Sequence, residues 1–253
     1  MPEPFVLSVF SLIVLLAVYA QTVTGFGLAM IVMGLASGLN IASVAALASV
    51  ISIVTVVNSL IALRGRFRQT GGRVVLSMVV GVLPASVLGV LILNYLSASA
   101  TTILQVLLGL VIVAGGVSFA WRPAVLKHVS SGYSFAAYGF MGGLIGGMFG
   151  IPGPPLIFQF YRQPMSLGEI RNALIMINLV IATTRTGFVY AQGDISPDIL
   201  LLSGICLPLV ALATVLGRRY PPPLAPEAMR RLAFGMLVLM GGSLIISALT
   251  PFI

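Results

Sequence analysis

The sequence predicts an all-α polytopic membrane protein built from two inverted repeats of about 125 residues, each opening with a broken or re-entrant helical hairpin. Three observations lead to this fold class. The composition is strongly apolar, a set of landmarks recurs half a chain later, and the basic loops of one half match neutral or acidic loops of the other.

The apolar composition predicts membrane-spanning helices. Hydrophobic residues make up 59% of the 253 residues and charged residues only 7%, far below the roughly 25% of a typical soluble domain. Runs of about 20 apolar residues recur along the chain, and each is long enough to cross a bilayer as a helix. The expected apolar segments are approximately 5–39, 41–63, 74–96, 99–121, 131–161, 167–191, 197–217 and 229–250.

The same composition excludes several classes of function. The net charge of +8 is spread over short loops, as membrane topology requires, and does not form one patch for nucleic acid. The only cysteine is Cys206 and the only histidine is His128, so a Cys/His metal site has no ligand set and an ordinary catalytic triad has no base at depth. We therefore predict no enzyme activity, no catalytic residue, no metal, no cofactor and no nucleic-acid partner.

Landmarks of the first half recur, in the same order, 124 to 126 residues later. The matched pairs are Gly25 with Gly150, Leu83-Pro84 with Leu207-Pro208, Tyr95 with Tyr220, and Gly115-Gly116 with Gly241-Gly242. Because four apolar segments also fill each half, we predict a duplication. The first repeat spans residues 1–122 and the second spans residues 123–253.

The charges of equivalent loops are opposite in the two halves. The loop 64–73 carries four arginines, whereas its equivalent 192–198 carries two aspartates and no base; the neutral stretch 94–99 matches 218–231, which carries four arginines. By the positive-inside rule, 64–73, 122–127 and 218–231 face the cytoplasm and the other two loops face outward. The two halves therefore point in opposite directions, and both termini are expected outside.

Opposite orientations require one segment of each half to enter the membrane and return. In the second half this is 131–161, with its tip at Gly150–Pro155; in the first half it is 5–39, with its tip near TVTGFGLAM, residues 22–30. The 31 residues of 131–161 make about 46 Å of helix, whereas two crossings need about 60 Å, so the arms are short or one is partial. Non-helical backbone at membrane depth needs protein or a water-filled cavity around it. The alternative is a tight turn outside the membrane between two tilted helices.

Two such breaks form a candidate site for a small anion. A helix that restarts after a tip points its unpaired amide groups and the positive end of its dipole at that tip. Glycines there let a ligand approach the backbone. Arg185, well within segment 167–191, is an intramembrane cation that suits sulfonate, sulfate or carboxylate groups. The alternative interpretation is that the Arg185 side chain snorkels, so that its charged group reaches the outer surface.

Polar side chains complete the candidate site. Asn58 and Asn178 lie on the second helices of the two halves, where they either line the path or bond between helices. Gln21 and Gln159 flank the two breaks and either contact the ligand or cap the backbone. The candidate substrate-binding residues are Gly25, Phe26, Gly27, Gly150, Pro152, Gly153, Arg185, Asn58, Asn178, Gln21 and Gln159.

This pattern resembles the sulfite exporter TauE/SafE family, also described as anion permeases for sulfur-containing compounds. The residues that carry the resemblance are TGFGLAMIVM, 24–33, and GGMFGIPGPPLIFQFYRQ, 146–163, and it covers the whole chain. In many members of the family, the second break resembles a triple-glycine motif that is followed by a proline some residues later. Here the stretch 150–155 reads GIPGPP, and no proline follows soon after Gly27. The resemblance implies transport of sulfite, organosulfonates or related small anions, and a homodimer by family habit.

We therefore expect a secondary transporter in the bacterial inner (plasma) membrane, with a small anion and membrane lipid as its partners. Export is favoured because an inside-negative potential drives anions outward. Coupling to protons or sodium stays open, with Glu169 as the only carboxylate on a helix expected to line the path. The alternatives are an importer of a small sulfonate or carboxylate anion and a non-transporting membrane assembly partner.

Overall fold

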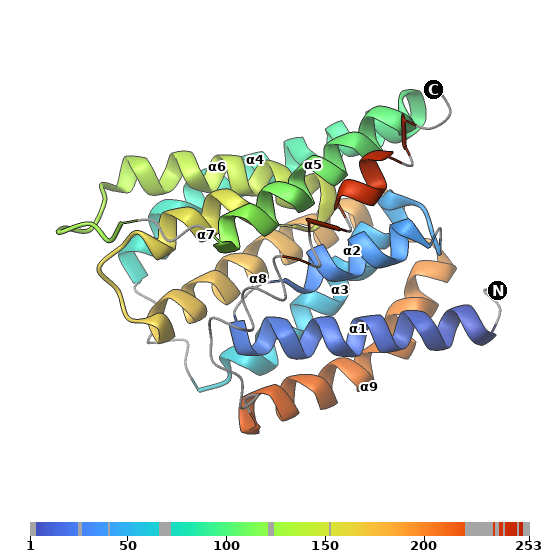
Figure 1. Ribbon diagram of the computed structural model, residues 1–253, viewed down its shortest axis with the longest axis horizontal. Coiled ribbons are helices and arrows are strands. Elements are labelled where there is room, and N and C mark those ends of the chain that lie inside the picture. The colour runs from blue at the N-terminus through green and yellow to red at the C-terminus, as the bar shows by residue number, and fades with distance from the viewer. Residues whose placement is uncertain are drawn as a thin grey trace.

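The computed structural model describes residues 4–24, 27–39, 41–65, 72–120, 124–151 and 153–220, together with some residues between 235 and 249. These residues form helices joined by short connections, without a strand among them (Figure 1). In chain order the helices are α1 (Pro4–Thr24), α2 (Leu28–Gly38), α3 (Val44–Leu63), α4 (Gly72–Ser99), α5 (Thr101–Ala120), α6 (Gly132–Phe149), α7 (Gly153–Tyr161), α8 (Leu167–Ala191) and α9 (Pro197–Arg219). The predicted all-α class is confirmed. The expected repeat boundary at 122–123 and half of segment 229–250 lie outside the described residues.

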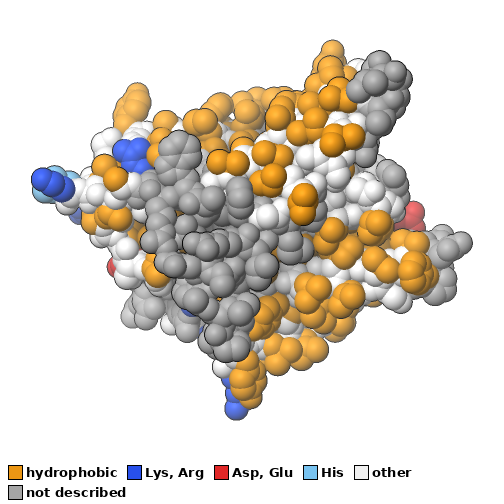
Figure 2. All heavy atoms as spheres, viewed as in Figure 1, with side chains coloured by type: hydrophobic (Ala, Val, Ile, Leu, Met, Phe, Trp, Pro, Cys, Tyr) orange, Lys and Arg blue, Asp and Glu red, His pale blue; other side chains and the backbone are white. Residues whose placement is uncertain are grey.

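Five of these helices, α1, α3, α4, α8 and α9, are long and apolar enough to cross a membrane. Hydrophobic side chains cover much of the face seen in Figure 2, and large ones such as Leu76 and Val80 are each 66% exposed. A continuous apolar exterior of this kind is suited to lipid rather than to water. The chain is therefore an integral membrane protein.

Serine residues define where four of the helices begin. Ser43, Ser131, Ser166 and Ser196 have extended backbone, and each side chain accepts a hydrogen bond from the backbone N–H three residues later. This satisfies one of the amide groups that a helix start leaves unpaired. In α8 the carboxylate of Glu169 also accepts from the Ser166 N–H at 2.9 Å, which completes a capping box. Glu169, the carboxylate on a helix expected to line the path, is thus an exposed capping residue at the start of α8.

Both predicted helix interruptions are present. α6 ends where Gly150 takes a left-handed conformation with φ 69°, and α7 restarts at Gly153, whose φ is 50°. In the first half, α2 restarts after Gly27, whose φ is 108°. Residues with a Cβ atom rarely adopt such angles, so glycine is required at these three positions. In each pair the first arm is long, with 21 residues in α1 and 18 in α6, and only the second arm is short, with 11 in α2 and 9 in α7.

Long helices of one half pack against long helices of the other. α4 lies against α6 and α1 lies against α9, while α3 contacts both α8 and α9. Figure 1 shows α1 beside α9 along the lower edge of the bundle. The contact between α4 and α6 is close enough to need glycine, because a Cβ atom at Gly81 would lie 2.0 Å from the Ala136 carbonyl oxygen. A Cβ atom at Gly139 would lie 2.4 Å from the Met78 carbonyl oxygen and one at Gly143 2.8 Å from that of Val82, so glycines of the stretch 139–150 also serve this close packing.

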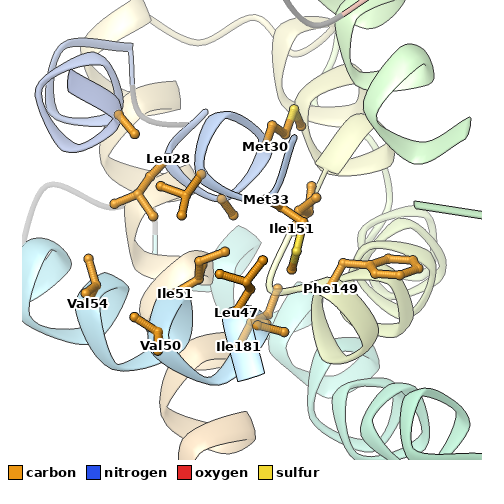
Figure 3. Close-up of a cluster of buried hydrophobic side chains, with 14 of the residues drawn as sticks. Leu28, Met30, Met33, Leu47, Val50, Ile51, Val54, Phe149, Ile151 and Ile181 are labelled. Atoms are coloured by element: carbon orange, nitrogen blue, oxygen red, sulfur yellow. The ribbon is translucent and has the colours of Figure 1, made fainter. Parts of the chain in front are cut away.

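The two helix breaks lie at the apolar core of the bundle. Figure 3 shows Leu28 and Met33 of α2, Ile51 of α3, Ile151 of the second break and Ile181 of α8 gathered in one apolar cluster. All five side chains are at most 2% exposed. Burial of this apolar surface holds the non-helical backbone between α3 and α8, where protein surrounds it on the sides that would otherwise face lipid.

Candidate functional site

A small pocket, here called the central pocket, lies between the two helix breaks. Its space for the centres of water-sized molecules is about 20 Å³, enough for about one water. Its lining residues are Gln21, Gly27, Ala29, Met30, Ser52, Thr55, Gly150, Ile151, Gly153, Leu156, Ile157, Leu174, Asn178, Ile181 and Ala182. The structure thus brings together residues from both halves of the chain in one cavity.

The central pocket lies level with the middle of the long helices. Thr55 is near the midpoint of α3 (Val44–Leu63), and Asn178 is near the midpoint of α8 (Leu167–Ala191). Both helices are long enough to span a membrane. The second break, with Gly150 and Gly153, therefore lies at the depth of the helix centres rather than in a turn beyond their ends.

The chemistry of the central pocket is apolar with a few polar groups. Most of its walls are aliphatic, and the polar side chains are those of Gln21, Ser52, Thr55 and Asn178. α7 begins at Gly153 on the wall of the pocket. Because Pro154 and Pro155 have no N–H group, only Gly153 and Leu156 among its first four residues carry an amide donor without an intrahelical partner. An apolar cleft with a few placed polar groups is typical of small-molecule sites, and a helix start favours an anion.

Asn58 lies outside the pocket lining and forms a buried polar network. Its Nδ2 donates to the hydroxyl oxygens of Thr22 at 3.1 Å and Thr214 at 2.8 Å, and its Oδ1 accepts from Gln21 Nε2 at 2.8 Å. The network joins the last turn of α1 to α3 and α9. Of the two alternatives for Asn58, the geometry is that of bonding between helices, with Gln21 extending from this network to the pocket.

Arg185 is buried, with an exposed fraction of 1%, and does not snorkel. Its Nε donates to the Gly147 carbonyl oxygen at 2.9 Å, and its Nη1 donates to Ser49 Oγ at 3.4 Å and Ser52 Oγ at 3.2 Å. Gly147 lies in the last turn of α6 (Gly132–Phe149), where carbonyl groups lack intrahelical partners and the helix dipole is negative. Arg185 therefore caps the broken end of α6.

A second cavity lies on the other side of Arg185 and is here called the Arg185 cavity. It offers about 230 Å³ for the centres of water-sized molecules. Its lining residues are Ser43, Ala45, Ala46, Ser49, Leu93, Asn94, Arg185, Val189, Asp194 and Ile199. Because Ser43 and Asp194 are exposed, the cavity reaches the protein surface at the end where α8 finishes and α9 begins.

The structure separates the remaining candidate residues. Gln159 of α7 is fully buried but lies outside both cavities; its Nε2 donates to Ser134 Oγ at 3.2 Å, near the start of α6. Gly25, Phe26 and Pro152 lie outside the described residues. The central pocket thus includes five of the candidate residues, namely Gln21, Gly27, Gly150, Gly153 and Asn178.

Sequence reasoning missed the hydroxyl residues of α3. Ser49, Ser52 and Thr55 recur every three residues in the stretch SVISIVT, and Asn58 continues the series one turn later. This spacing places them near one face of a helix that is otherwise apolar. The face points towards the two breaks and Arg185, so this polar stripe was the available signal. Thr22 and Thr214 carried no comparable pattern.

Comparison with known proteins covers nearly the whole chain. The family model described as sulfite exporter TauE/SafE matches residues 10–244. A protein of Cupriavidus necator, described as a probable sulfite/organosulfonate exporter TauE, is 49% identical over 235 residues, which are 93% of this chain and 92% of that protein. No solved structure matches. The matched residues include both helix breaks and the lining of both cavities.

Proposed function

Because the chain belongs to the sulfite exporter TauE/SafE family of membrane transporters, we propose that it exports small sulfur-containing anions, such as sulfite or organosulfonates. We propose that it works by alternating access around the paired breaks. The observation that carries this proposal is the central pocket, which both breaks and both halves line at the level of the helix centres. Secondary transporters with broken helices bind substrate in such a place. The homodimer that the resemblance implies stays a prediction.

The size of the central pocket supports a mechanism with moving parts. About 20 Å³ is room for about one water, whereas a sulfite ion has four heavy atoms. Binding therefore requires the walls contributed by α2 and α7 to separate from α3 and α8. An arrangement that is closed around the site, and must open to load and release, is what alternating access needs.

The packing of helices of one half on helices of the other half supports two inverted repeats. α1 to α4 follow the same order of long and short elements as α6 to α9, with Pro84 inside α4 and Pro208 inside α9. α4 packs on α6 as α1 packs on α9, so each half contributes the equivalent pair of contacts. A two-fold relation between the halves would produce this exchange, and in a membrane it would make one half the inverse of the other.

The charges at the helix ends support the expected orientation. Arg218, at the C-terminal end of α9, donates to the Arg64 carbonyl oxygen at the end of α3, so these basic ends lie together. Asp194 and Asp198 flank the start of α9, at its other end. Figure 2 shows basic side chains at the left and lower ends of the molecule, with a small acidic spot at the left edge, and an acidic side chain without basic ones at the right. By the positive-inside rule we propose that the basic end is cytoplasmic, so that α1 begins outside.

Flux of radiolabelled sulfite through proteoliposomes tests the proposal. Thr55→Val and Asn178→Leu remove polar groups of the central pocket, and each is expected to lower flux about tenfold to a hundredfold, because hydrogen bonds to charged groups are worth about 1.5–3 kcal/mol. Thr183→Val is the matched control, since Thr183 is exposed on α8 and bonds only within it, to the Leu179 carbonyl oxygen. Unchanged flux in both pocket variants would remove the proposed site.

The same assay tests direction. An inside-negative potential of 100 mV favours outward movement of one negative charge by about 2.3 kcal/mol, or about 50-fold in the equilibrium ratio. We expect export to rise with the imposed potential. Flux that ignores the potential would contradict export driven by voltage alone and would point to an electroneutral, ion-coupled mechanism.

A further inference from the structure

Arg185 stands between the central pocket and the Arg185 cavity. Its Nη1 is shared by two hydroxyl groups of α3, at 3.2 Å from Ser52 Oγ and 3.4 Å from Ser49 Oγ. Ser52 lines the central pocket and Ser49 lines the Arg185 cavity. Ser52 and the guanidinium group of Arg185 together therefore form a partition: Ser52 lines the central pocket, whereas Arg185 and Ser49 line the Arg185 cavity.

The hydrogen-bond partners of this guanidinium group are uncharged. They are the Gly147 carbonyl oxygen and the two serine hydroxyl groups. Ser49 and Ser52 donate their own protons to the carbonyl oxygens one turn earlier, at 3.0 Å and 2.8 Å, so both present lone pairs to the cation. Dipoles compensate a buried charge less completely than an opposite charge does. An anion in either cavity would compete with the serines for Nη1.

The Arg185 cavity can hold such an anion without movement of the helices. It offers about 230 Å³ against about 20 Å³ in the central pocket. It also opens to the surface beside exposed Ser43 and Asp194. Asp194 puts a carboxylate in the same cavity as the guanidinium group, so an anion there meets attraction at the inner end and repulsion from Asp194. This combination favours weak, rapidly reversible binding.

We propose that the Arg185 cavity is a second anion site, which receives a small sulfonate or sulfite ion on its way between the central pocket and the outside. The inference rests on the proposed function. The anion leaving the central pocket replaces first Ser52 and then Ser49 as the partner of Arg185 Nη1. It then binds in the Arg185 cavity until it is released beside Asp194. Arg185 is thus a ligand shared by two sites, and the serines hold it while no anion is bound.

Cysteine modification in the purified full-length protein tests the second site directly. Ala46→Cys introduces a thiol on the wall of the Arg185 cavity, and Ala98→Cys introduces one on an exposed position near the end of α4, outside both cavities. The native Cys206 is fully buried, so the unmodified chain serves as the blank. The probes are the anionic 2-sulfonatoethyl and the cationic 2-(trimethylammonio)ethyl methanethiosulfonates. Methanesulfonate is the competing anion.

We expect the anionic reagent to modify Ala46→Cys at least tenfold faster than the cationic reagent, relative to their rates on Ala98→Cys. Methanesulfonate is expected to protect Ala46→Cys and not Ala98→Cys. Equal relative rates, or absence of protection, would overturn the second site.

Variants of the partition separate a ligand role of Arg185 from a purely structural one. Arg185→Lys keeps the charge and loses the planar fork, so the preference for the anionic reagent should persist while protection needs at least tenfold more methanesulfonate. Ser49→Ala removes a competing acceptor, so protection should need less methanesulfonate than in the parent. An Arg185 that serves only to hold α6 would give no stronger protection in Ser49→Ala, and that result would contradict the proposal.

The outcomes also distinguish this inference from the proposed function. Protection that depends on Arg185, in a chain that carries no sulfite across proteoliposomes, would leave the second site standing and remove the transport proposal. Transport that depends on Thr55 and Asn178, without any protection of Ala46→Cys, would do the reverse.

Discussion

The broken ends of α1 and α6 are equivalent in chain order, yet different chemistry holds each of them. At the end of α1, Gln21 and Thr22 bond to Asn58 of α3, and every group in the contact is neutral. At the end of α6, the Gly147 carbonyl oxygen accepts from Arg185 of α8, which is a full positive charge. In both cases the neighbouring long helix of the same half supplies the polar side chain.

At the end of α1 all hydrogen-bond donors of Asn58 are used, whereas at the end of α6 Arg185 can still bind a charged partner. Asn58 uses Oδ1 once and Nδ2 twice inside the network, so its donors are saturated. Arg185 has only uncharged partners, and its cation lines a cavity that reaches the surface. The end of α1 is therefore suited to stabilising the fold, and the end of α6 is suited to binding an anion.

The two long arms also differ in how closely they are packed. A Cβ atom at Gly147 of α6 would lie 2.1 Å from the Ser86 carbonyl oxygen of α4. At the equivalent contact of α9 with α1, a Cβ atom at Gly217 would lie 3.1 Å from the Thr22 Cβ atom. At Gly147 the backbone of α4 would have to shift, whereas at Gly217 the neighbouring Thr22 would have to give by only a few tenths of an ångström. Of the two long arms, α6, whose broken end accepts a hydrogen bond from Arg185, is thus more rigidly placed than α1.

The largest expected effect comes from the packing difference. Gly147→Ala forces α6 away from α4 and should destabilise the protein by about 3 kcal/mol, because overpacking typically costs about 1–3 kcal/mol and a contact with backbone is at the upper end of this range. Gly217→Ala should cost less than about 1 kcal/mol, and Gly187→Ala, which has open space around it, should cost least. Thermal unfolding of the purified variants gives the order. A Gly217→Ala variant as unstable as Gly147→Ala would contradict the asymmetry.

The next effect separates function from stability at the two ends. Arg185→Gln should lower sulfite flux at least a hundredfold, since it removes the charge proposed to bind the anion. Asn58→Leu should keep flux within about threefold while lowering the melting temperature, because it leaves buried partners without a hydrogen bond, at a cost of about 1–3 kcal/mol. Flux in proteoliposomes and melting curves on the same preparations supply both readouts. Loss of flux in Asn58→Leu at wild-type stability would reverse the assignment.

Much of the fold was predictable because its signals are local. The apolar runs and the two Gly/Pro-rich breaks each follow from a few neighbouring residues, and the helices confirm them. The length of each arm was not predictable, because the sequence of 131–161 allows two short helices as readily as one long and one short. Tertiary packing decides this: the glycine contacts with α4 extend α6 as far as Phe149.

The candidate site was predictable only in part, for a physical reason. Glycines at breaks and the side-chain amides of Asn and Gln in apolar segments are recognisable by residue type, and five of these candidate residues line the central pocket. The partner of Arg185 is a backbone carbonyl group at Gly147, which no residue type reveals. Within segment 167–191 the acidic residue is Glu169, near the end far from Arg185, so the sequence of that segment suggests an unpaired cation. Serines such as Ser49 are equally hard to identify, because they bond to their own helix and are tolerated in apolar segments.

The smallest expected effect comes from the hydrogen bond between Gln21 and Asn58 in the neutral network at the end of α1. Gln21→Leu and Asn58→Leu remove the two partners of one 2.8 Å hydrogen bond, so a double-mutant cycle should give a coupling energy of about 0.6 kcal/mol, the average for such bonds in membranes. Gln163→Leu replaces Gln21→Leu in the control cycle, because Gln163 bonds to Ser130 and the Gln159 carbonyl oxygen in a separate cluster. That control should be additive. The coupling should appear in unfolding. It should not appear in the apparent affinity for sulfite, because Gln21 lines the central pocket and Asn58 does not, so the effect of Gln21→Leu on affinity should be the same with or without Asn58; coupling in affinity would mean that Asn58 also acts on the anion.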